Sequence, residues 1–267
     1  MALSESVAKE TTKPVIEMEN IVKHFGGVHA LDGVDLSLRD HEILGLLGDN
    51  GSGKSTLLKT LVGVHQPDSG RIRIRGEECN FSSPREARDV GISTVYQDLA
   101  LVDAQSVAAN IFLGRNPTKR VVGLPVVDWG RMNQEAERIL SERLNIQIDP
   151  TSKVEYLSGG ERQAIAIARA LVTEPDIIVM DEPTSALSAD SASRVEELID
   201  TLQDEGLSIL LISHNFDEVF SLTDRMTVLE SGDHVGTVNT SNVSRRDIVQ
   251  MMVDGRVPED IEEDSDF

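Results

Sequence analysis

The sequence predicts an α/β fold in which helices cover a mostly parallel core sheet. The first observation is a glycine-rich loop at residues 48–55, which lies between the apolar run "HEILGLLG" and the helix-forming run "KSTLLKTLVGV". The second is the alternation of strand-like and helix-like runs from residue 176 to residue 223, which is typical of parallel strands joined by helices. The third is "GRIRIRG", whose period of two predicts an antiparallel strand and a smaller N-terminal β subdomain.

The predicted elements of the first half follow in order. Residues 1–13 are polar, and we expect them to be flexible. The runs "VIEMENIV" and "VDLSLRDHEILGLLG" predict strands, the second of which ends at the glycine-rich loop. A helix follows this loop, and the antiparallel strand comes next. Residues 98–157 contain helical patches such as "MNQEAERILSERL", broken by Gly and Pro, which predict an inserted helical subdomain.

In the second half, "DIIVMD" and "LSILLIS" predict buried strands, and "SASRVEELIDTLQDEG" and "NFDEVFSLT" predict helices. The run "RMTVLESGDHVGTV" predicts a hairpin that turns at Gly232-Asp233, and a short helix is expected near Ile248. Residues 255–267 are acidic, which predicts a disordered tail. We therefore expect one domain over residues 14–254, without an internal repeat.

The composition limits the possible partners and location. The chain has 46 acidic and 25 basic residues and a net charge of -21, which disfavours nucleic acid or an anionic membrane as a partner. This charge fits either an ordinary solvated surface or adaptation to high salt. The single cysteine, Cys79, cannot form an internal disulfide. No apolar run approaches the roughly 20 residues that span a bilayer, and no signal peptide is recognisable, so we expect a protein that stays inside the cell.

Residues 48–55 match the phosphate-binding pattern G-x-x-x-x-G-K-[ST]. In that pattern the loop's backbone N–H groups converge on phosphate oxygens, the Lys54 ammonium adds charge at the β- and γ-phosphates, and the Ser55 hydroxyl can bind Mg²⁺. A glycine turn before a helix can match this pattern by accident. The predicted strand before the loop and the predicted helix after it favour a phosphate-binding loop instead. The predicted nucleotide-binding residues of this stretch are Gly48, Asp49, Asn50, Gly51, Ser52, Gly53, Lys54, Ser55 and Thr56.

Three predicted strands end in polar residues that could meet this loop. Asp181 and Glu182 follow "DIIVM", and we expect Asp181 to hold Mg²⁺ and Glu182 to polarise an attacking water. His214 follows "SILLIS" and could hydrogen-bond a γ-phosphate. Gln97 follows "STVY", and its amide could reach Mg²⁺ or the attacking water. Each residue alone could be a solvated turn residue, but three such strand ends together favour a catalytic site.

A second candidate phosphate-binding helix start lies at Ser158-Gly159-Gly160-Glu161, about a hundred residues after the first. Ser158 and Glu161 have the spacing of a capping box, and the apolar residues that follow continue as a helix. Free backbone N–H groups at such a start attract anions. The sequence therefore predicts two anchors for one nucleotide.

These motifs, in the order "GDNGSGKST", "YQD", "LSGGERQ", "VMDEP", "SALS" and "SHN", resemble the ATPase subunits of ABC transporters over residues 15–238. The resemblance implies a P-loop NTPase fold and ATP and Mg²⁺ as cofactors, and it places Phe25 on the adenine with Val28 beside it. It further implies a homodimer in which Ser158, Gly159 and Gly160 of one subunit contact the γ-phosphate bound to the other. Ser188 departs from the aspartate common at its position, which leaves the contacts of that loop across the dimer open.

The segment "VYQDLALVDAQSVAANIFLGRNP" resembles the corresponding sequence in the ATPases of monosaccharide importers of the ribose, xylose and fructose type. Such a subunit would be peripheral at the cytoplasmic face of the membrane, bound to separate polytopic permease subunits. It would cooperate indirectly with a secreted sugar-binding protein. Two alternatives stay open: a soluble ABC ATPase that acts on a protein scaffold, as in iron-sulfur assembly, and a module that binds ATP without hydrolysing it.

Overall fold

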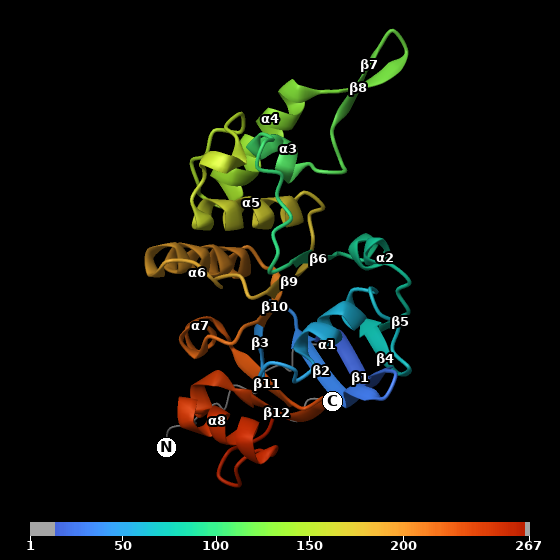
Figure 1. The fold of residues 1–267 in the computed structure, drawn as a ribbon, viewed down its shortest axis with the longest axis vertical. Helices are drawn as coiled ribbons and strands as arrows, with labels where there is room; N and C mark the ends of the chain where they lie inside the picture. Colours follow the sequence, from blue (N-terminus) through green and yellow to red (C-terminus); the bar gives the residue numbers. More distant parts are fainter. Residues whose placement is uncertain (1–13, 265–267) are drawn as a thin grey trace, which may run out of the picture.

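The computed structural model describes residues 14–264 (Figure 1). The predicted flexible segment 1–13 and the last three residues of the predicted tail lie outside this range. Within residues 14–264, no helix is both long and apolar enough to cross a membrane.

The core is a six-stranded sheet in the order β12-β11-β3-β10-β9-β6, in which β11, β3, β10, β9 and β6 are parallel and β12 is antiparallel to β11. The mostly parallel sheet is thus confirmed. Its strands are β3 (Ile43–Leu47), β6 (Ile92–Val95), β9 (Ile177–Asp181), β10 (Ser208–Ile212), β11 (Arg225–Glu230) and β12 (Asp233–Asn239). The predicted hairpin of β11 and β12 forms, with its turn at Ser231 and Gly232.

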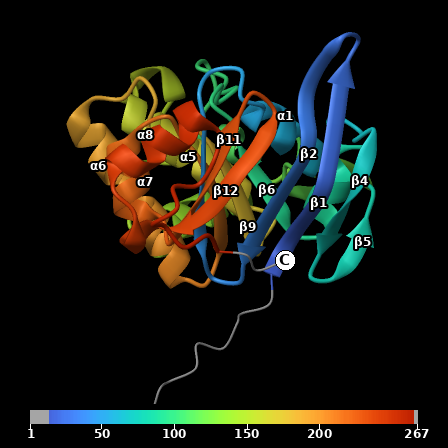
Figure 2. The same cartoon turned by 90° about the horizontal axis from the view of Figure 1, so that it is seen from below.

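A second sheet of four antiparallel strands lies beside the core sheet, in the order β2-β1-β4-β5 (Figure 2). Its strands are β1 (Pro14–Phe25), β2 (Val28–Arg39), β4 (Ser69–Ile74) and β5 (Glu77–Cys79). Ile72 and Ile74 of β4 are buried while Arg71 and Arg73 are more accessible, as the alternation in "GRIRIRG" predicts. The N-terminal antiparallel subdomain is therefore confirmed.

Helices cover both faces of the core sheet, and its central strands β3, β9 and β10 are buried at nearly every position. Leu44 and Leu46 of β3 pack with α1 and the antiparallel sheet, whereas Ile43 packs with α5 and α6 on the other face. The helices outside the inserted subdomain are α1 (Lys54–Leu61), α2 (Pro84–Asp89), α5 (Gly159–Leu171), α6 (Ala189–Asp204), α7 (Phe216–Leu222) and α8 (Arg245–Asp254).

The inserted segment forms the end of the molecule opposite α8 (Figure 1). It contains α3 (Val107–Ile111), α4 (Trp129–Arg138), a π-helical turn (Ile139–Arg143) and a 3₁₀ turn (Val154–Tyr156). It also contains a hairpin of β7 (Thr118–Val121) and β8 (Leu124–Val127), which the sequence did not predict. Nearly all residues of this hairpin are exposed, so its sequence lacks the alternation that burial of one face imposes.

The described part of the acidic tail packs against the two sheets. The Asp264 carboxylate pairs with Arg39 Nη2 at 2.8 Å and with Arg225 Nε at 2.9 Å, and the Asp264 N–H donates to the Thr237 carbonyl. The prediction of a disordered tail rested on its charge and did not anticipate these contacts. Arginine side chains more than thirty residues away in sequence provide the partners, and no local pattern indicates them.

Candidate active site

A pocket of about 780 Å³ lies at the carboxyl ends of the parallel strands. Parallel strands bring their carboxyl ends to one edge of a sheet, so residues from β3, β6, β9 and β10 meet there. The predicted site residues that line the pocket are Val28, Gly48, Asp49, Asn50, Gly51, Gly53, Lys54, Ser55, Thr56, Gln97, Asp181, Glu182 and His214. The structure thus joins both predicted parts of the site, the loop after β3 and the polar ends of the other strands.

The loop between β3 and α1 requires glycine at two positions. Gly48 has a φ of 154°, and a Cβ atom there would lie 2.4 Å from the Leu229 carbonyl oxygen. Gly53 has a φ of 106°, and a Cβ atom there would lie 2.8 Å from the Ala30 carbonyl oxygen. Because glycine has no Cβ atom, the backbone can follow a tight path around the start of α1 that a side chain at either position would block.

Lys54 is buried at the first turn of α1, where its ammonium donates to the carbonyl oxygens of Gly48 at 2.7 Å and Asp49 at 3.0 Å. Burial lowers the pKa of this ammonium, and the nearby Glu182, Asp49 and Asp181 carboxylates oppose that shift. The loop therefore holds a positive charge in place before any ligand arrives. Such a preorganised charge suits the terminal phosphates of a nucleotide.

Glu182 and His214 are in direct contact after the ends of β9 and β10. His214 Nδ1 lies 2.7 Å from Glu182 Oε2, and the Glu182 side chain is 15% exposed against 64% for His214. Glu182 has a φ of 52°, and its N–H donates to the Ile212 carbonyl at 2.8 Å. A left-handed conformation in a non-glycine residue is strained and clusters at functional sites. The sequence predicted both residues but not their contact.

Asp181 lies beside this pair in the same pocket. Its pKa is raised, first by burial and then by the Glu182 carboxylate, while Lys59 and Lys54 act in the opposite direction. Ser55 and Gln97 line the pocket with it. The hydroxyl, amide and carboxylate oxygens of these three side chains are a donor set of the kind that Mg²⁺ prefers.

Several predicted site residues do not line the pocket. Phe25 is 45% exposed on the antiparallel sheet, with its ring 5.1 Å from the His65 ring in an edge-to-face arrangement. Ser52 lies within the phosphate loop but its side chain is buried. Val28, which pairs with Phe25 across the β1-β2 hairpin, does reach the pocket. Of the two residues predicted at the adenine, Val28 therefore lines the pocket and Phe25 lies next to it.

Ser158, Gly159 and Gly160 do not line this pocket either. Their predicted capping box is confirmed, because the Glu161 carboxylate accepts from the Ser158 N–H at 2.8 Å and Ser158 Oγ accepts from the Glu161 N–H. The Cβ position of Gly159 lies 2.9 Å from Leu187, so this helix start packs closely against the loop before α6. Within a single chain, the helix start at Ser158 is therefore separate from the pocket around the phosphate loop.

Other residues line the pocket without having been predicted, namely His29, Ala30, Leu47, Phe216 and Met252. His29 and Ala30 immediately follow Val28, so the prediction for Val28 could have been extended to them. Met252 comes from α8, about 200 residues after the phosphate loop, and no local pattern connects the two. The packing of α8 against β11 brings Met252 to the pocket.

Glu218 is a buried carboxyl group that connects the loops that carry Glu182 and His214. Ser213 lies one residue before His214, and its hydroxyl donates a hydrogen bond to Glu218 Oε2. Thr184 lies two residues after Glu182, and its side chain also hydrogen-bonds the Glu218 carboxyl group. Burial raises the pKa of Glu218 above its ordinary value of 4.5, and the Ser213 and Thr184 bonds oppose this shift. The sequence analysis gave this residue no role.

We expect the stability of the Glu218→Gln variant to fall less with rising pH than the stability of wild type. Because the pKa of Glu218 is higher when folded than when unfolded, its contribution to stability is present below pH 4.5 and is lost as pH rises through the folded pKa. Glutamine has no proton to lose, so the thermal midpoint of the variant should rise relative to that of wild type as pH rises. The expected rise is ~2–4 °C for each kcal/mol of stability that wild type loses. Thermal denaturation at several pH values measures this; a constant difference would contradict it, and Asp217→Asn, an exposed neighbour, is the control.

The fold and the pocket together define a P-loop NTPase with an antiparallel subdomain and an inserted helical subdomain. The sequence profile of the ABC transporter family matches residues 31–185, and the chain belongs to this family.

Two curated relatives have similar sequences. The chain is 42% identical to a putative ribose/galactose/methyl galactoside import ATP-binding protein of Geobacillus kaustophilus, over 90% of this chain and 47% of that protein. It is also 42% identical to the ribose import ATP-binding protein RbsA of Caldanaerobacter subterraneus, over 90% of this chain and 48% of that protein. The chain thus spans about half the length of these relatives.

A solved structure, the ADP conformation of MJ1267, an ATP-binding cassette of an ABC transporter, has a similar fold. It is 27% identical, with a TM-score of 0.75, and the match covers 91% of this chain and 96% of that one. The resemblance stated from the motifs is thereby confirmed, as is the fold class.

Proposed function

We propose that this chain binds and hydrolyses ATP to power import of a monosaccharide through separate membrane subunits. The observation that supports hydrolysis best is the Glu182–His214 pair, which lies in one pocket with Lys54 and Asp181. Membership of the ABC transporter family and the names of the import relatives support the same reading. These names favour import over the alternative of a soluble scaffold ATPase.

ATP would bind with its phosphates against the N–H groups of residues 48–56 and the Lys54 ammonium. Ser55, Gln97 and Asp181 would hold Mg²⁺, which neutralises charge on the β- and γ-phosphates when bound. The adenine would stack on Val28, which lines the pocket, and on Phe25, which pairs with Val28 across the hairpin.

Glu182 would orient the attacking water and accept its proton, because its carboxylate is the partly buried member of the pair. The Nδ1 atom of His214 holds this carboxylate at 2.7 Å, and the exposed side of the imidazole is free to meet the γ-phosphate. The bond from the Glu182 N–H to Ile212 fixes the strained backbone from which the carboxylate projects.

Dimerisation would complete the site. Ser158, Gly159 and Gly160 do not line this chain's own pocket, yet they form a capped helix start at which a phosphate could bind. In a homodimer each such helix start would contact the γ-phosphate held by the partner. Hydrolysis would then loosen the dimer, because the shared phosphate is lost.

Import would also require membrane partners, and we place the chain peripherally at the cytoplasmic face. A polytopic permease would bind through the inserted subdomain near residues 98–116, and a secreted sugar-binding protein would act indirectly through that permease. Residues Val102 and Leu113 of this segment are exposed apolar side chains that such a contact could bury.

Capture from detergent-solubilised membranes of the source cells tests this assignment. With ATP present, the full chain carrying Glu182→Gln should recover a polytopic membrane protein, and adding Val102→Arg should abolish recovery. Val64→Arg is the matched control, because Val64 is equally exposed but lies outside the inserted segment. Recovery of an iron-sulfur scaffold protein in place of a membrane protein would contradict the proposal.

A further inference from the structure

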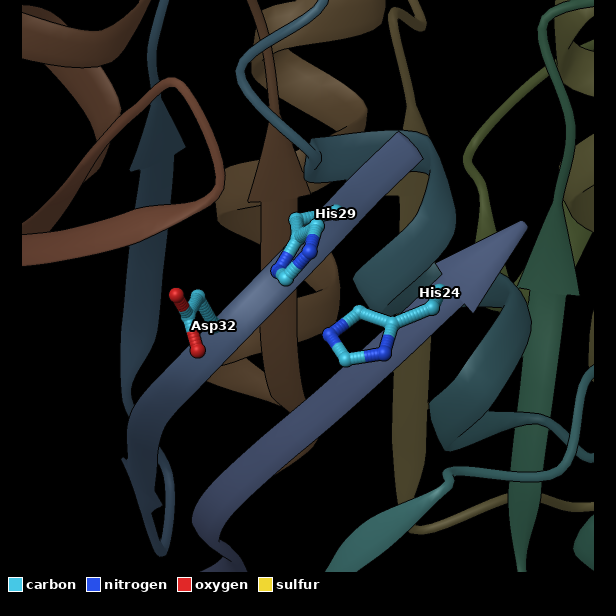
Figure 3. Close-up of side chains that lie close together, drawn as sticks. All are labelled: His24, His29 and Asp32. Carbon is cyan, nitrogen blue, oxygen red and sulfur yellow. The ribbon is translucent and has the colours of Figure 1, made fainter. Parts of the chain in front are cut away.

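Two histidines and an aspartate gather on the antiparallel sheet, outside the catalytic part of the pocket. They are His24 of β1 and His29 and Asp32 of β2, whose side chains point toward one another (Figure 3). One ligand atom from each of the three lies within 4.8 Å of the other two. None of the steps proposed for ATP hydrolysis uses these side chains as a group.

A β-bulge brings the three side chains to one face of the sheet. His24 is paired with His29 and Val22 with Asp32, and the register shifts between Lys23 and His24. Paired residues point to the same side of a sheet, as do residues two apart on one strand. The extra residue that the shift leaves on β2 lies between His29 and Asp32, so these two face the same way although they are three apart.

His24 is the anchor of the cluster. Its Nε2 atom is buried and has no hydrogen-bond partner among residues 14–264. Its backbone N–H donates to the Asp68 carboxylate, which also accepts from Lys23, so the strand is held at this point. The His24 and His29 ring centroids lie 4.1 Å apart at 48°. A bond to a cation would give the buried nitrogen the partner that it lacks.

The donor types select the kind of cation. Imidazole nitrogens are preferred by Zn²⁺ and its first-row neighbours, whereas Mg²⁺ prefers oxygen ligands. At Zn–N and Zn–O distances of about 2.0–2.2 Å, tetrahedral ligand atoms are about 3.3 Å apart, so atoms within 4.8 Å need only modest side-chain rotations. His29 and Asp32 are exposed, which leaves a position open for water.

We propose that His24, His29 and Asp32 bind one divalent transition-metal ion of the Zn²⁺ type, separate from the Mg²⁺ of the catalytic site. Such an ion would join β1 to β2 on both sides of the turn at Gly26 and Gly27. Phe25 and Val28 flank this turn, so the ion would fix the strands that hold the two residues proposed to stack on the adenine. The metal site does not depend on the proposed ATP hydrolysis, since its ligands lie on the hairpin alone.

Calorimetric titration with ZnCl₂ tests this inference on the full chain without nucleotide or affinity tag. Potassium chloride at about 0.3 M reduces non-specific attraction to the acidic surface. Wild type should bind one Zn²⁺ per chain, and His24→Ala or His29→Ala should weaken binding by ~100-fold or more. His29 is exposed, so loss of binding in that variant would not reflect unfolding. Co²⁺ should give a visible absorption band in wild type that His29→Ala lacks.

His41→Ala is the matched control. His41 is also an exposed histidine beside a carboxylate, with its Nε2 3.5 Å from Asp40, but among residues 14–264 it belongs to no cluster with a second histidine. This variant should bind Zn²⁺ as wild type does. Equal weakening in His41→Ala and His29→Ala, or no saturable binding of Zn²⁺ to wild type below about 1 mM, would overturn the proposal.

Discussion

Replacing Glu182 with glutamine is expected to lower ATP turnover by at least ~100-fold while leaving ATP binding nearly unchanged. Glutamine keeps the size of the side chain and can still hydrogen-bond His214, but it cannot accept the proton of the attacking water. The Lys54 ammonium and the loop of residues 48–56 are untouched, so the phosphates should bind as before. Steady-state phosphate release measures turnover, and calorimetric titration with ATP measures binding.

The matched control for Glu182→Gln is Asp217→Asn, which removes an exposed carboxylate on α7 close to the same pocket. It should leave turnover within about twofold of wild type, because surface charges contribute little. Wild-type turnover in Glu182→Gln would exclude this carboxylate as the base. A parallel loss of turnover in both variants would instead indicate that the general acidity of the region matters.

Lys54→Ala is expected to abolish hydrolysis and to weaken ATP binding by about 2–5 kcal/mol, at least ~30-fold in Kd. The ammonium is buried and already directed at the loop by the Gly48 and Asp49 carbonyls, so alanine removes a preorganised charge that no neighbour replaces. Lys59→Ala is the control, because this lysine is one turn further along α1 and exposed. A Kd for ATP unchanged by Lys54→Ala, measured by calorimetry, would contradict the placement of the phosphates.

The parallel sheet and most of the pocket could be predicted from the sequence, for one physical reason. Residues that end parallel strands must meet at one sheet edge, so Gln97, Asp181 and His214 could be brought together without knowledge of the packing. The phosphate loop is local and has its own pattern. These features depend on neighbours in sequence or on a rule that holds for all parallel sheets.

Features that depend on contacts between distant segments could not be predicted. The contact of Met252 with the pocket and the pairing of Asp264 with Arg39 and Arg225 both depend on how the C-terminal segment packs. The exposed β7-β8 hairpin has no buried face to impose a pattern. The Glu182–His214 contact depends on the strained turn after β9, and strain at a single residue leaves no periodic signal.

Static light scattering with ATP tests whether two copies of the chain share two ATP sites. Glu182→Gln with ATP should have twice the monomer mass, and the double variant Glu182→Gln with Ser158→Arg should stay monomeric. An arginine at the start of α5 would block the partner's γ-phosphate from the free N–H groups there. Nucleotide titration should show that the double variant still binds ATP.

Ser244→Arg, added to Glu182→Gln, is the matched control for loss of a helix cap. Ser244 forms a capping box with Asp247 at the start of α8, as Ser158 does with Glu161 at the start of α5. We expect a dimer with Ser244→Arg and a monomer with Ser158→Arg. A dimer that persists with Ser158→Arg, or a Glu182→Gln protein that remains monomeric with ATP at high concentration, would contradict it.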